Sequence, residues 1–178
     1  MLYFMKPLPD SKINTTNWNP FIKNQWFRKN FMYFVYCLQA MLIIFSIIFG
    51  VWRFSNAFIK VGLFVCIFIV HELLHLIVIY KVGDISITHS GIFFWITSGA
   101  VLNKLRFFAF MSLPFIGLTV VPAITCVFLS GGLKDTVAYI AWINSIIAGS
   151  DIINSVLIAI KPNNSLFYRG YYKTASCL

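Results

Sequence analysis

The chain has 178 residues, of which 60% are hydrophobic and 11% are charged, and its formal net charge is +9. Soluble domains carry about 25% charged residues, and a single soluble domain of this length cannot bury so much apolar surface. The composition therefore excludes a soluble globular domain, a disordered chain and a disulfide-stapled secreted domain, and it predicts a small multi-pass membrane protein.

Four stretches are long and apolar enough to cross a bilayer as helices, which takes about 20 residues each. In chain order they are residues 31–52, 61–80, 107–129 and 136–160. We therefore predict an all-α polytopic membrane protein with about four transmembrane helices. Its predicted parts are a cytoplasmic N-terminal arm over residues 1–30, a membrane domain over 31–160 and a cytoplasmic tail over 161–178.

The segment 82–103, which follows the second predicted span, has the pattern of a β-hairpin. Ile85 and Ile87 alternate with polar residues, which is the period of a strand, and Ser90 with Gly91 is a turn signal. The alternative is an irregular loop at the membrane interface.

The 14 basic residues are distributed unevenly. Eleven lie in the N-terminal arm, the connection between the second and third spans, and the tail, whereas three lie in the other two connections. By the positive-inside rule this predicts a multi-pass protein of the cell membrane with both termini cytoplasmic. The basic excess is thus explained by the topology; the predicted partner is the lipid bilayer, and no nucleic-acid partner is predicted.

The second predicted span contains the motif His71-Glu72-Leu73-Leu74-His75. Two histidines four residues apart lie about 40° apart around a helix, so both rings can bind one ion, and neutral imidazole favours Zn²⁺. Glu72 is offset from them, where it can act as general base on a water molecule that the metal activates. The alternative is a buried polar cluster that holds helices together.

A zinc hydrolase site takes three protein ligands and one open position. Asp151, in the fourth predicted span, is the best candidate for the third ligand, because a carboxylate in hydrocarbon needs compensation. Asn144 shares its helical face, or residues 149–151 break the helix and begin a new one. Asp151 paired for packing alone is the alternative, and His89 and Asp84 are competing ligands.

The His71–His75 motif, the β-rich segment after it, and Asn144 followed by Asp151 together resemble the putative zincin peptidase family. These are small bacterial membrane proteins related to the site-2 proteases, which are intramembrane metalloproteases. The resemblance covers about residues 57–160. It implies that His71, His75 and Asp151 hold zinc, that Glu72 is the catalytic base, and that Asn144 helps to hold the substrate or the oxyanion.

The resulting hypothesis is an intramembrane zinc metallopeptidase acting on a membrane-protein or peptide substrate. The substrate segment unwinds and adds as a strand to the hairpin edge at residues 85–88. Two other functions stay open: a non-enzymatic zinc-stabilised scaffold or adaptor, and a metal transporter with the same three residues as its permeation site.

Overall fold

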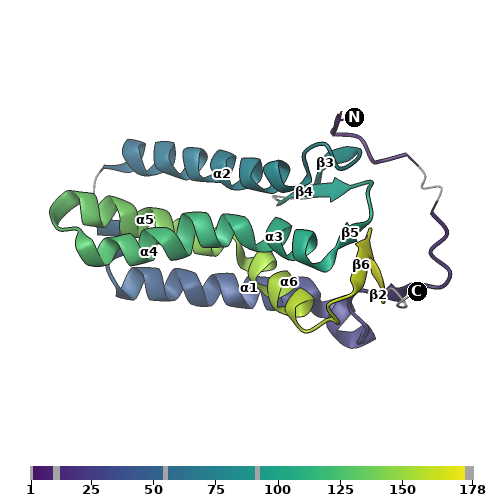
Figure 1. Ribbon diagram of the computed structural model, residues 1–178. Helices are drawn as coiled ribbons and strands as arrows, with labels where there is room; N and C mark the ends of the chain where they lie inside the picture. Colours follow the sequence, from purple (N-terminus) through teal and green to yellow (C-terminus); the bar gives the residue numbers. More distant parts are fainter. Residues whose placement is uncertain (1, 10–12, 54–55, 91–92, 175–178) are drawn as a thin grey trace.

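A long apolar run in a bilayer can satisfy its backbone only internally, and the three longest runs fold as helices. In this computed structural model, which describes residues 2–9, 13–53, 56–90 and 93–174, they are α1 (Gln25–Ile48), α2 (Ala57–Ile79) and a segment that begins with α3 (Lys104–Phe115). The helices lie side by side along the molecule (Figure 1). All three are long and apolar enough to cross a membrane.

The third of these segments is irregular in its middle. Pro114 and Pro122 lack the N–H that a regular helix needs, and a π-helical turn lies between them. After α3 the segment continues as η2 (Ile116–Val120), α4 (Val121–Thr125) and η3 (Cys126–Phe128).

The predicted fourth span is a bent pair of helices. α5 (Gly131–Ile147) and α6 (Gly149–Ala159) meet at an angle of 67°. Of the two alternatives predicted for this span, the structure has the broken helix, and the break lies at Ala148, directly before residues 149–151. Within the described residues, three helical segments are apolar and long enough to span a membrane, or four if the bent pair counts as one span, and the protein is therefore a multi-pass membrane protein.

The first helix begins at Gln25, six residues before the predicted span. The side chain of Asn24 accepts a hydrogen bond from the backbone N–H of Phe27 and so caps the helix. The prediction followed the apolar run alone, whereas the cap starts the helix before that run.

The predicted hairpin after the second span is confirmed. β3 (Ile85–Ser90) and β4 (Phe93–Ser98) pair antiparallel, with Ile85 opposite Ser98. A third strand, β1 (Leu2–Phe4), pairs parallel with β3, so the strand order is β1-β3-β4. The N-terminal arm therefore adds a strand to the sheet.

The fold is mostly helical, as predicted, but it holds more β-structure than the one predicted hairpin: two small sheets stand at one end of the helices (Figure 1). The second sheet has the order β2-β7-β6-β5 and draws its strands from both ends and the middle of the chain. Strands of two to four residues are too short for alternation to reveal them. These strands are β2 (Asn19–Pro20), β5 (Leu102–Asn103), β6 (Ser165–Tyr168) and β7 (Tyr171–Thr174).

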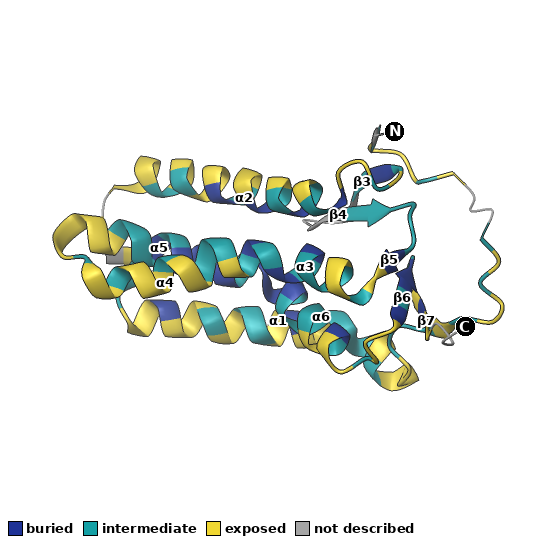
Figure 2. Cartoon of the chain, viewed as in Figure 1, coloured by how far each residue is buried: buried dark blue, intermediate teal, exposed yellow. Residues whose placement is uncertain are grey.

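Burial follows the arrangement expected in a bilayer: the outer faces of α1 and α2 are exposed and apolar, and the buried residues face inward (Figure 2). Ile79 at the end of α2 packs with Ile85, Leu102 and Phe110, which joins the hairpin to α3. The hairpin therefore packs against the end of α2, one helical turn after His75.

Candidate metal centre

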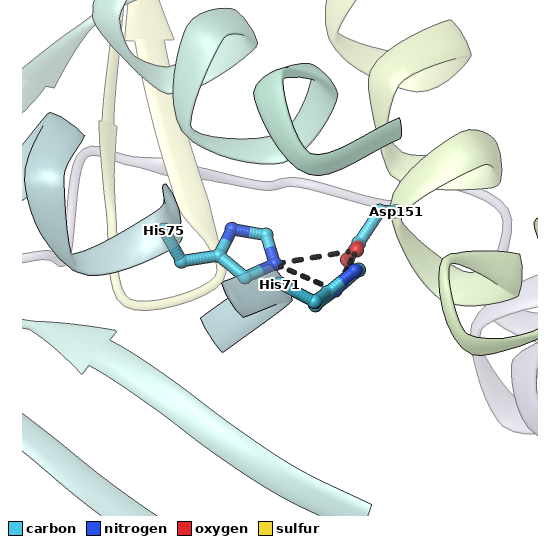
Figure 3. Close-up of side chains that lie close together, drawn as sticks. All are labelled: His71, His75 and Asp151. Atoms are coloured by element: carbon cyan, nitrogen blue, oxygen red, sulfur yellow. Dashed lines mark hydrogen bonds and ion pairs between the residues drawn. The ribbon is translucent and has the colours of Figure 1, made fainter. Parts of the chain in front are cut away.

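Three buried side chains from α2 and α6 converge in the interior (Figure 3). His71 Nε2 lies 3.0 Å and His75 Nε2 3.3 Å from Asp151 Oδ2, and the two Nε2 atoms are 3.2 Å apart. The histidines are one helical turn apart on α2 and point to the first turn of α6, where Asp151 is 7% exposed. The two predicted histidines and the predicted aspartate are thus brought together.

The other nitrogen of each ring is held by an acceptor. His75 Nδ1 lies 2.6 Å from the backbone carbonyl oxygen of Phe110, which can only accept, so Nδ1 carries the proton. His71 Nδ1 lies 2.9 Å from Asn144 Oδ1. The Asn144 amide nitrogen donates to the carbonyl of Pro114, so its oxygen is the end that faces His71. Both Nε2 lone pairs are therefore left to face Asp151.

This donor set fits zinc. Two neutral imidazole nitrogens and a carboxylate oxygen form the three-ligand set of catalytic zinc sites, with a fourth position left for water or substrate. Bonds of about 2.0–2.1 Å in tetrahedral geometry place ligand atoms about 3.3 Å apart, close to the separations of 3.0–3.3 Å between these atoms. Lone pairs that face one another at such distances repel unless a cation lies between them.

Glu72 lies beside this centre without being one of the three ligands. It is half-buried and lines the same cavity of about 370 Å³ as the three ligands. A second cavity of about 570 Å³, between the two sheets, shares Ile96, Phe110, Met111 and Asn154 with the first. These residues form a common wall, so the cavity at the metal centre borders the cavity at the sheet end of the molecule.

The competing ligands are placed as follows. Asp84 lies before β3, where its backbone carbonyl accepts from the N–H of Gly99, and it is not a member of the cluster. The backbone of His89 belongs to β3, but its side chain lies outside the described residues. Of the side chains that the structure describes, Asp151 is the carboxylate that meets both histidines.

Asn144 is fully buried and makes three hydrogen bonds. Its oxygen faces His71, and its nitrogen donates to the carbonyl of Pro114 and to Thr119 Oγ1. This places it as a support for the His71 ring; the oxyanion role implied by the resemblance stays a prediction. Sequence reasoning missed the supports at Phe110 and Pro114, because a backbone carbonyl leaves no signal in the sequence.

The fold and the site define a class: a helical multi-pass membrane protein with a buried His-His-Asp metal centre. A glutamate that is not one of the three ligands lies beside this centre. The family model described as "Putative zincin peptidase" matches residues 64–166, and the chain belongs to this family. The family implies zinc as the metal, which agrees with the donor set, and its name suggests a zinc metallopeptidase. Searches of curated proteins and of solved structures found no match.

The support of His71 by Asn144 gives a first prediction. Asn144→Leu removes the acceptor at Nδ1, frees the ring to turn, and is expected to weaken zinc binding by about 10–100-fold, as the loss of such supporting groups does. Competition with a chromogenic chelator measures it. Thr136→Val, which changes a polar residue elsewhere on α5, serves as control. Wild-type zinc affinity in Asn144→Leu would show that Asn144 does not support the ring.

Proposed function

We propose that the protein is an intramembrane zinc metallopeptidase that hydrolyses a peptide bond in or near a transmembrane segment, as the site-2 proteases do. The observation that carries the proposal is the position of Glu72, which shares a cavity with the three ligands but is not one of them. A purely structural site is closed and needs no such carboxylate. The family to which the chain belongs supports the peptidase class.

The proposed chemistry divides between the metal and the chain. His71, His75 and Asp151 would hold the zinc, which would supply Lewis-acid polarisation of the scissile carbonyl and of the attacking water. Glu72 takes a proton from that water as the water oxygen bonds to the carbonyl carbon. It then delivers the proton to the leaving amine as the C–N bond breaks. Asn144 and the carbonyl of Phe110 keep the two imidazoles in place.

The proposal is tested with purified, zinc-loaded protein and a panel of membrane-segment peptides. Zinc-dependent hydrolysis of any of them is the expected result. Zinc binding without hydrolysis of any peptide would support the scaffold instead, and zinc flux into proteoliposomes would support the transporter.

The sheet requires one correction to the proposed substrate path. The predicted docking edge, residues 85–88, is not free, because β3 has β1 on one side and β4 on the other. Beyond β1, the N–H of Met5 donates to the carbonyl of Ile87, and Ser86 Oγ donates to the carbonyl of Lys6. A substrate strand that uses β3 must therefore displace the N-terminal arm.

Because the substrate strand must displace the N-terminal arm, weakening the hydrogen bonds between the arm and β3 should speed hydrolysis. Met5 has a φ of 56° and donates its N–H to Ile87 at 2.8 Å, and proline permits neither. We expect Met5→Pro to raise kcat/KM by about 2- to 10-fold, the factor for a net hydrogen bond of about 0.5–1.5 kcal/mol. Met5→Ala keeps the N–H and is the control. An unchanged kcat/KM in Met5→Pro would place the substrate elsewhere than on β3.

The orientation in the membrane is part of the proposal. β1 pairs with β3 and β7 pairs with β6, and β3 and β6 lie at the same end of the molecule (Figure 1). The basic residues favour the cytoplasm for that end. We expect a reporter that works only in the cytoplasm to be active when it is fused after Leu178. Activity of a periplasmic or extracellular reporter at that position would reverse the orientation.

A further inference from the structure

The position of Asp151 depends on the angle between α5 and α6. Asp151 lies in the first turn of α6, directly after the 67° bend, whereas both histidines lie on α2. A change in the bend moves Asp151 relative to the two rings. Whatever fixes the bend therefore fixes the third ligand.

A side chain from α1 is bound at the bend. Gln39 Nε2 donates to the backbone carbonyl of Ile146 at 2.9 Å, in the last turn of α5. The last carbonyls of a helix have no partner within it, and a side chain from a neighbouring helix can supply the missing donor. Gln39 thus satisfies a carbonyl at the break, and it lines the metal cavity together with Asp151.

Gly149, the first residue of α6, gives Gln39 the room to reach this carbonyl. A Cβ at Gly149 would lie 2.9 Å from Gln39 Cγ, closer than side chains normally approach, and 3.5 Å from the Gln39 amide nitrogen. The Gln39 side chain therefore lies against the backbone of the break itself, and a larger residue at position 149 would push it away from Ile146.

From these contacts we infer that Gln39 is a positioning residue for the metal centre: it holds the α5–α6 break and thereby places Asp151 opposite His71 and His75. α1 lies before the residues 64–166 that the family model matches, so this helix contributes to the site from outside the matched region. The inference rests on the metal centre of the proposed function and does not depend on peptide hydrolysis.

The test is the thermal stabilisation that zinc gives, measured as Tm with zinc minus Tm with chelator, together with zinc affinity. Gln39→Met keeps the length of the side chain and removes the donor. We expect zinc affinity to fall by about tenfold and the zinc-dependent part of Tm to shrink. The matched control is Ile44→Met, at a 56% exposed position of the same helix, which should change neither quantity.

A structural role alone predicts a different pattern. If Gln39→Met lowers Tm equally with and without zinc and leaves zinc affinity unchanged, the inference is overturned. The visible absorption of the Co²⁺-substituted protein gives a further readout, because a displaced Asp151 alters the ligand field. An unchanged spectrum in Gln39→Met would also count against the inference.

Gly149→Ala tests the same contact from the other side, should Gln39→Met not fold. It is expected to weaken zinc binding, whereas Gly132→Ala, at a glycine with open space around it on α5, is not. Adding Gly149→Ala to Gln39→Ala should cost little further affinity, since both act through one contact; full additivity would contradict this. None of these readouts needs turnover, so their failure leaves the peptidase proposal standing, and a wild-type protein without peptidase activity leaves the inference standing.

Discussion

Glu72→Gln is expected to lower peptide hydrolysis by about 10²–10⁴-fold, the usual contribution of a general base, while zinc stays bound. Gln keeps the size and polarity of the side chain and removes its basicity. Glu72 is not among the three ligands, so the metal should remain. The measurements are the zinc content of the purified variant and its turnover of a peptide that the wild-type protein cleaves.

The control for this prediction is His71→Ala, which removes a ligand and is expected to lose both zinc and turnover. Comparison of the two variants separates binding from chemistry. Equal zinc loss in both would make Glu72 a ligand, and wild-type turnover in Glu72→Gln would argue against the mechanism as a whole.

The sequence reveals those residues of the site that lie close together along the chain or that are costly to place in an apolar span. His71 and His75 are a single helical turn apart, so the helix alone brings them together. Asp151 is 76 residues further along than His75, yet a carboxylate in an apolar span is costly enough to indicate a partner. The structure places these three side chains within 3.3 Å of one another.

The parts that the sequence does not reveal are those made of backbone or of very short elements. The carbonyls of Phe110 and Pro114 support the site, but any residue type supplies a carbonyl. The second sheet is built from strands of two to four residues, which show no period. Gln39 is a polar residue within an apolar span, but its hydrogen bond to the carbonyl of Ile146 follows only from the packing of α1 against the bend.

Asp151→Asn is expected to weaken zinc binding by more than about 100-fold, because groups that merely orient a ligand are already worth about 10–100-fold. Asn keeps the shape and removes the charge. Asp151 joins α6 to α2 through the metal, so the zinc-loaded variant should also unfold at a lower temperature than wild type. Once zinc is chelated, the difference in Tm should be much smaller. Chelator competition and thermal unfolding with and without zinc measure these effects.

The alternative third ligands, His89 and Asp84, predict a different result. If the third ligand came from the hairpin, His89→Ala or Asp84→Asn would show the loss of zinc and of zinc-dependent stability, and Asp151→Asn would not. The geometry favours Asp151, whose Oδ2 lies 3.0 and 3.3 Å from the two imidazole nitrogens and whose side chain is almost fully buried between α2 and α6. A buried carboxylate at that depth is stabilised by a cation, and the two Nε2 atoms facing it lie where that cation would be held. We therefore expect both hairpin variants to bind zinc as wild type does, and wild-type affinity in Asp151→Asn combined with a loss in His89→Ala would move the third ligand to β3.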